Sequence, residues 1–222
     1  MVQQSKKSKS VWDNGKFIVA LAPMAGITDQ PFRLMCKKFG ADLLFSEMVS
    51  CDALWHRKLK AKNEKLKTLR LIKFSSVERP FVVQIFGSDP IKMTYASEYI
   101  SSGEWHEDYL EITNNKSQIT NKSQSPKSQI PNIPRVGKLG FENYLKFDAC
   151  DLEFTSIPSG IDVNMGCPAR DVTKVCAGSA LMKNPKLAEK IIKSIKKKTK
   201  LPMSVKTRLG WENPKDILTF SR

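Results

Sequence analysis

The chain has 222 residues, of which 41% are hydrophobic, so it is long enough for one substantial core and too apolar for a disordered chain. Its longest mostly apolar run, 17–27, is shorter than the roughly 20 residues that cross a bilayer, and its polar start does not resemble a secretory signal. The net charge of +15 suits solubility or a polyanionic partner, nucleic acid first and an anionic membrane surface second. Five cysteines without a C-x-x-C pair, and two histidines, argue against disulfides or a metal site and favour the cytoplasm.

Five short apolar runs have the character of β-strands, and several are apolar at successive positions, as in parallel strands covered on both faces. Helical patterns follow them. One ends at Gly40, and Asp89-Pro90 and Asn184-Pro185 each resemble an N-cap followed by a first-turn proline. The alternation predicts a parallel sheet with helices packed outside it. The strands are expected at 17–22, 42–45, 81–86, 161–164 and 203–207.

This pattern is interrupted between 102 and 159. The triplet Lys-Ser-Gln occurs three times there beside several prolines, and the composition is poor in apolar residues. We expect a low-complexity, largely disordered insertion that takes no part in chemistry, and the alternative is an RNA-contacting arm. The rest of the chain then divides into a polar basic tail (1–16), a first set of strand–helix units (17–101) and their continuation (160–222).

Two segments at strand ends carry residues suited to a flat heterocycle. Pro23, Met24 and Ala25 follow the first expected strand, where small residues let the backbone approach a ligand, although an ordinary capped turn explains the same composition. Gln84 lies near the end of the third strand. Its amide could pair with a ring carbonyl and nitrogen, or simply bond to a neighbouring loop.

Cys167 lies in the segment Asn-Met-Gly-Cys-Pro, directly after the fourth expected strand. Glycine and proline bound a tight loop here, whereas an inert cysteine is usually a small buried residue on an apolar face. Thiols ordinarily titrate near pH 8.5 and are mostly protonated at neutral pH, so such a group can act as a general acid. A nucleophilic role is the rival, but neither histidine is placed by the sequence to act as its base.

Lys206 and Arg208 alternate along the fifth strand and are expected on one side of it. A lysine turned into the interior is costly unless it meets an anion, and the solvated end of an edge strand explains the pair equally well. The lysine-rich stretch 193–200 is typical of a solvated helix end, which can also add to a field that attracts RNA.

Six segments occur in a fixed order at these strand ends. They are A-P-M-A-G-I-T-D (22–29), S-E-M-V-S (46–50, after the second strand), V-Q-I-F-G (83–87), D-V-N-M-G-C-P-A-R-D-V (162–172), A-G-S-A-L-M-K-N-P (177–185) and V-K-T-R-L-G-W (205–211). In content and order they resemble the tRNA-dihydrouridine synthase family, over about 17–100 and 160–213, and the segment around Cys167 is the most diagnostic.

The resemblance implies an FMN-binding TIM barrel followed by a helical domain that grips tRNA. It implies reduction of uridine in tRNA to 5,6-dihydrouridine, with NADPH or NADH as reductant and Cys167 as the acid that protonates C5. The implied cofactor contacts are Pro23, Met24, Ala25, Gln84 and Lys206. The implied contacts to the substrate base are Asn164 and Arg208.

About five of the eight βα units of such a barrel are visible. The expected fold is therefore a partial (β/α)8 TIM barrel, with an irregular insertion between its third helix and fourth strand. The family's strands six to eight, a histidine on the sixth, the glycine-rich phosphate loops and the helical domain have no counterpart. An open sheet leaves strand edges unpaired, so we expect weak flavin retention and little activity from this chain alone. The alternatives are another FMN-barrel pyrimidine oxidoreductase, such as a dihydroorotate dehydrogenase-like enzyme, and a non-catalytic basic RNA-binding remnant.

Overall fold

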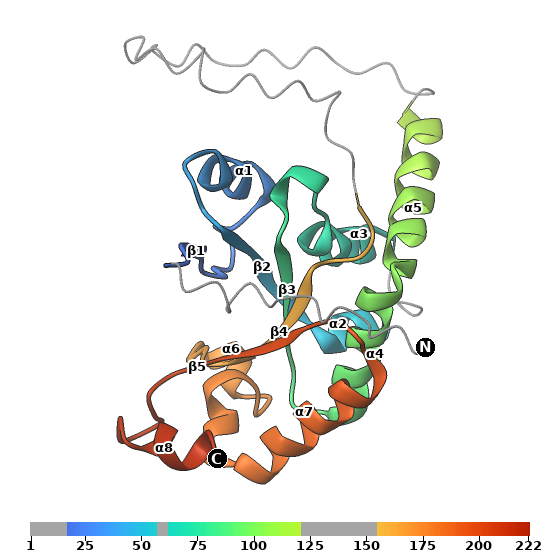
Figure 1. Ribbon diagram of the computed structural model, residues 1–222. Helices are drawn as coiled ribbons and strands as arrows, with labels where there is room; N and C mark the ends of the chain where they lie inside the picture. Colours follow the sequence, from blue (N-terminus) through green and yellow to red (C-terminus); the bar gives the residue numbers. More distant parts are fainter. Residues whose placement is uncertain (1–16, 57–61, 121–154) are drawn as a thin grey trace, which may run out of the picture.

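The structure is a computed structural model that describes residues 17–56, 62–120 and 155–222. Within them, five parallel strands form one sheet in chain order, with helical connections between successive strands (Figure 1). This is the arrangement of the first five units of an α/β barrel, and it confirms the predicted fold class. The strands are β1 Ala20–Leu21, β2 Leu43–Ser50, β3 Phe81–Phe86, β4 Gly160–Met165 and β5 Met203–Thr207.

Several of the helices begin directly after a residue whose side chain caps them. Asp89 and Asn184 accept hydrogen bonds from backbone N–H groups in the first turns of the helices that follow, as predicted, and Asp29 does the same. The helices are α1 Gln30–Lys38, α2 Cys51–Trp55, α3 Lys62–Ile72, α4 Pro90–Ser102, α5 Glu104–Thr120, α6 Arg170–Thr173, α7 Pro185–Lys198 and α8 Asp216–Phe220, with 3-10 turns η3 Ser76–Glu78 and η6 Gly178–Lys183.

Strand β2 is longer than predicted, and β1 is shorter. The segment S-E-M-V-S was expected after the second strand, but it lies within β2. The polar residues Ser46 and Glu47 made the strand seem to end early. The register against β3 shifts between Phe45 and Met48, and Ser46 Oγ accepts a 2.9 Å hydrogen bond from the backbone N–H of Gln84. The bulge therefore uses a polar side chain to continue the pairing.

The two faces of the sheet differ in chemistry. Side chains of β3 and β4 that point toward the helices, such as Val83, Ile85 and Val163, are fully buried in the main hydrophobic core. Because side chains alternate along a strand, Val82, Gln84 and Asp162 belong to the opposite face. There, a small apolar cluster of Leu43, Phe45 and Val82 lies toward the amino ends of the strands, and polar side chains follow toward the carboxyl ends.

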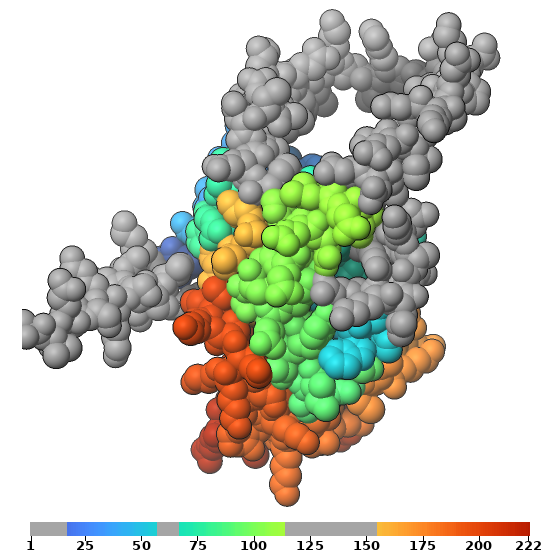
Figure 2. Space-filling view, turned by 90° about the vertical axis from the view of Figure 1, so that its right-hand side faces the viewer, coloured from blue at the N-terminus to red at the C-terminus, as the bar shows by residue number. Residues whose placement is uncertain are grey.

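The predicted irregular insertion begins with a helix. Residues 104–120 form α5, so the expectation of an irregular segment was wrong for them. The reason is local: Trp105 is fully buried and its indole N–H donates to the carbonyl of Ser156 at 2.6 Å, and Ile112 is also buried. Figure 2 shows α5 packed alongside α4 on this side of the molecule. Residues 121–154 and the tail 1–16 lie outside the described residues.

None of the helices in the described part of the chain is long and apolar enough to cross a membrane.

Candidate active site at the carboxyl ends of the strands

A side chain of strand β4 fixes the backbone of the loop that carries Cys167. Asn164 lies in β4 and is 6% exposed. Its Oδ1 accepts hydrogen bonds from the backbone N–H groups of Gly166 (3.1 Å) and Cys167 (2.9 Å). This is the local cap that short amide side chains provide to a turn, and it leaves the Cys167 side chain half-buried at the end of the strand.

Two further segments hold the same loop. Arg208 Nε donates to the Gly166 carbonyl at 2.8 Å, and the N–H of Ser179 donates to the Cys167 carbonyl at 2.9 Å. Gly178 has φ +60°, and a Cβ atom there would lie 2.6 Å from the Cys167 carbonyl oxygen. Only glycine allows this approach, which explains why the Gly-Ser pair of the fifth motif accompanies the Cys-Pro pair of the fourth.

A chain of buried hydrogen bonds runs sideways from Asn164 across three strands. Asn164 Nδ2 donates to Gln84 Oε1 at 2.9 Å, and Gln84 Nε2 donates to Asp162 Oδ2 at 2.6 Å. Ser204 Oγ donates to the other carboxylate oxygen of Asp162, also at 2.6 Å. The strand register explains the order, because Gln84 pairs with Asp162 and Asp162 pairs with Ser204. The polar face is thus one continuous network.

Asp162 was not singled out from the sequence. Burial raises the pKa of its carboxyl above the usual value, and the hydrogen bonds from Gln84 and Ser204 and the charge of Lys206 oppose that rise. The sequence signal existed: Asp162 and Asn164 stand two residues apart in an otherwise apolar strand, so both had to lie on one face.

The loop after β1 is also fixed. Thr28 Oγ1 accepts from the N–H of Met24 at 3.1 Å and donates to the Met24 carbonyl at 3.0 Å. Gly26 has φ +73°, and its N–H donates to the carboxylate of Glu47 in β2. This ties the loop to the neighbouring strand and leaves Pro23 and Met24 half-buried and Ala25 exposed.

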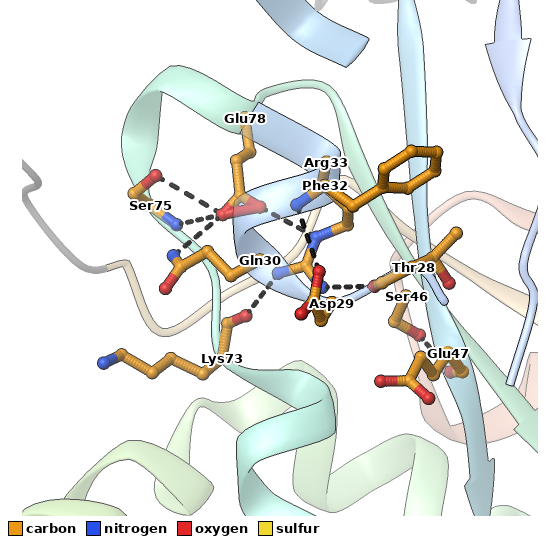
Figure 3. Close-up of polar contacts among 10 residues, drawn as sticks. All are labelled: Thr28, Asp29, Gln30, Phe32, Arg33, Ser46, Glu47, Lys73, Ser75 and Glu78. Atoms are coloured by element: carbon orange, nitrogen blue, oxygen red, sulfur yellow. Dashed lines mark hydrogen bonds and ion pairs between the residues drawn. The ribbon is translucent and has the colours of Figure 1, made fainter. Parts of the chain in front are cut away.

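A buried ion pair supports this loop from the far side. Arg33 Nε lies 2.8 Å from Glu78 Oε2, and both side chains are almost completely buried. The two Nη groups of Arg33 donate to the carbonyls of Thr28 and Lys73, each at 2.8 Å. Figure 3 shows that Glu78 Oε1 also accepts hydrogen bonds from the side-chain amide of Gln30 and the backbone N–H of Ser75. Every polar group of the ion pair therefore has a partner.

The structure brings some of the predicted site residues together. Gln84, Asn164 and the Cys167 backbone share one hydrogen-bond chain, and Arg208 reaches the same loop. Lys206 is exposed on β5 and pairs in register with Asn164. The loop with Pro23, Met24 and Ala25 lies at the same end of the sheet, because the carboxyl ends of parallel strands meet at one edge.

The residues present fit one side of a flavin ring. An exposed lysine beside Asn164 and a rigid loop of small and apolar residues suit an anionic ring edge and a flat face. Gln84 fits less directly, because it is fully buried and both ends of its amide are engaged within the sheet. In the described part of the chain, no group of three or more His, Cys, Asp or Glu side chains could hold a metal ion.

Comparison with known proteins gives a consistent result. A family model described as dihydrouridine synthase matches residues 20–107 and 148–221. The tRNA-dihydrouridine synthase B of Vibrio cholerae is 32% identical over 193 residues, which is 86% of this chain and 41% of that protein. The proteins of the same name from Xanthomonas axonopodis (29% over 195 residues) and Pasteurella multocida (32% over 195 residues) are each covered to 40%. The chain therefore spans about two fifths of the length of these curated relatives.

Proposed function

The chain belongs to the dihydrouridine synthase family, and we propose that it serves the FMN- and NAD(P)H-dependent reduction of uridine to 5,6-dihydrouridine in tRNA. The observation that carries the proposal is the Cys167 loop, which three separate parts of the chain hold at the carboxyl end of β4. The family match also favours this activity over that of a dihydroorotate dehydrogenase-like enzyme.

Cys167 is the proposed proton donor. Reduction of the C5–C6 bond needs a hydride at C6 and a proton at C5, and a protonated thiol at the rim of the sheet can supply the proton. When bound, FMN would supply the hydride, and NADPH or NADH would restore the reduced cofactor. The fixed backbone around Cys167 limits where its Sγ can lie, so the acid is positioned before the substrate arrives.

The neighbouring cations have separate proposed roles. Lys206 would balance the negative charge of a reduced flavin, because it is exposed on the polar face of the sheet. Arg208 uses its Nε to hold the loop, and its two Nη groups have no partner within the described residues. They can donate to a carbonyl oxygen of the uracil base, while Pro23, Met24, Ala25 and Gln84 stay the proposed flavin contacts.

The charge of the chain supports a tRNA partner. Lys and Arg exceed Asp and Glu by 37 to 22, and such a surplus attracts the phosphate backbone at low salt. A base inside folded tRNA must be turned out of its stack to reach a site at the end of a sheet, and a positive rim helps to hold the displaced strand.

The test is genetic, because it reports on the chain in its natural setting. In the cells that carry the gene, codon 167 is changed to give Cys167→Ala, and dihydrouridine is mapped by mass spectrometry along each tRNA. We expect the positions that lose dihydrouridine on deletion of the gene to lose it in this variant as well. The matched control is Cys176→Ala, because that cysteine is more exposed than Cys167 and follows it by only nine positions in the sequence.

Two results would count against the proposal. Full dihydrouridine in the deletion strain would favour the RNA-binding remnant. Loss in the deletion strain together with full modification in the Cys167→Ala strain would remove Cys167 as the acid.

A further inference from the structure

We propose that Asp162 is a positioning residue that holds, at the strand end, the direction of the hydrogen-bond chain ending at the backbone of Cys167. The chain of bonds runs from Asp162 through the amides of Gln84 and Asn164 to the N–H groups of the loop. The inference rests on the proposed function in one respect only, the naming of Cys167 as the reacting group.

The first step of the argument is the chemistry of the carboxylate. An ionised carboxylate only accepts hydrogen bonds, whereas a carboxamide donates from nitrogen and accepts at oxygen. Both oxygens of Asp162 receive donors, Gln84 Nε2 on one side and Ser204 Oγ on the other. Burial raises the pKa of the Asp162 carboxyl, and the two hydrogen bonds and the charge of Lys206 oppose that rise, but the geometry leaves both oxygens as acceptors. Gln84 therefore has to present its nitrogen to Asp162.

The second step is that this choice passes along the chain. With its nitrogen on Asp162, Gln84 presents Oε1 to Asn164, and Asn164 can answer only with Nδ2. The oxygen of Asn164 is then left for the two backbone N–H groups of the loop. If both amides were reversed, the nitrogen of Asn164 would face these N–H groups, and donors would oppose donors.

The third step is burial, because a buried chain has no easy access to water as a substitute partner. Gln84 is 0% exposed, Asp162 2% and Asn164 6%. A misdirected amide would leave buried donors without acceptors, which the low polarity of the interior makes costly. The two backbone N–H groups at the loop end can only donate, and the carboxylate at position 162 only accepts, so both ends of the chain require the same direction. Asp162 is the group that keeps the strand end in agreement with the loop end.

The test compares a variant that replaces the carboxylate of Asp162 with one that removes a hydrogen-bond donor to it. Asp162→Asn keeps the shape but puts a donor at position 162 that can oppose the amide of Gln84, whereas Ser204→Ala removes a hydrogen bond and leaves the carboxylate as an acceptor. Backbone hydrogen exchange of Gly166 and Cys167 is measured by NMR on the purified chain. In Asp162→Asn we expect exchange about tenfold faster, the factor that corresponds to ~1.4 kcal/mol for one lost hydrogen bond. Ser204→Ala should leave these two rates close to those of the unchanged chain.

A rescue variant separates direction from packing. In the double variant Asp162→Asn/Gln84→Glu the carboxylate moves one strand along. It can accept from Asn164 Nδ2 and from the new amide at position 162, so the original direction is restored. We expect slow exchange of both loop amides to return. The alkylation rate of Cys167 by iodoacetamide, read peptide by peptide, should change in Asp162→Asn and return in the double variant.

The exchange of Ile161 and Val163, which lie in the same strand, reports on the fold in each sample. If Asp162→Asn opens the whole sheet, these amides also exchange faster, and the double variant then decides the question. Unchanged loop amides in Asp162→Asn, or a double variant no better than the single one, would overturn the proposal. None of these measurements needs flavin or tRNA. The hydrogen-bond chain can therefore be confirmed in a protein that reduces no uridine, and it can be refuted in one that does.

Discussion

Two buried polar networks support the candidate site, and they work in different ways. Arg33 and Glu78 form a closed ion pair under the loop after β1, with all their partners supplied nearby. Asp162 begins an open chain of amides that ends at the Cys167 loop. The first network has charges that cancel, and the second has a carboxylate that is held by neutral donors and whose pKa burial raises.

The first network stabilises the position of a loop, whereas the second determines which hydrogen-bonding groups face a loop. An ion pair with every donor satisfied is insensitive to direction, since the guanidinium only donates and the carboxylate only accepts. An amide chain carries a direction, and the groups at its two ends have to agree on that direction. Breaking the first network should cost stability, whereas altering the second should change the reactive loop more than the stability of the fold.

The largest expected effect is from Glu78→Ala. It leaves the Arg33 guanidinium buried without its carboxylate, and the loss of one partner of a buried pair costs about 3–5 kcal/mol. Urea denaturation measures the free energy of unfolding. The matched control is Glu189→Gln, which breaks the exposed pair with Lys193 and should leave the midpoint unchanged. Equal shifts in both variants would remove the distinction between a closed buried network and a surface pair.

A smaller loss is expected from Trp105→Ala, at about 3 kcal/mol, because a fully buried indole is replaced by a cavity. Leu110→Ala on the same helix removes a side chain that is 44% exposed and should cost far less. The same denaturation experiment compares them. If the two variants were equally stable, α5 would not be part of the core, and the expectation of a peripheral insertion would hold for this helix as well.

The smallest effect concerns the pH dependence of stability. The pKa of Asp162 is raised in the folded chain, so between its ordinary value of 3.8 and that raised value the folded state binds more protons than the unfolded state. Stability from this group is therefore highest at low pH and falls as the pH rises through this window. Asp162→Asn lacks this titration. As the pH rises through the window, the free energy of unfolding of the unchanged chain should therefore fall relative to that of the variant. Unfolding curves at several pH values measure this difference, and a constant difference would contradict the raised pKa.

Local sequence predicted much of the frame. The bounds of β3 and β5 agree with the prediction, as do the caps of α4 and α7, because prolines and capping side chains act within a few residues. The helix α5 was missed because a polar average hid its buried anchors Trp105 and Ile112. The length of β2 was missed because Ser46 bonds to another strand, which no local pattern reports.

The candidate site shows the same division. The Gly-Cys-Pro loop was identified from its own residues, because glycine and proline constrain the backbone locally. The sequence suggested a substrate contact for Asn164 and a flavin contact for Gln84. The structure shows that both amides are already engaged, in a chain that begins at Asp162.

The sequence by itself determined the alternation of strands and helices, the helix caps and the tight loop at Cys167, since these depend on neighbours along the chain. Only the tertiary structure decided which way the buried amides point. The loop N–H groups require that direction at one end of the chain, and at the other end Asp162 agrees with it because it lies opposite Gln84, 78 positions away in the sequence. Strand register and burial create this contact, and the inability of a carboxylate to donate turns it into a direction.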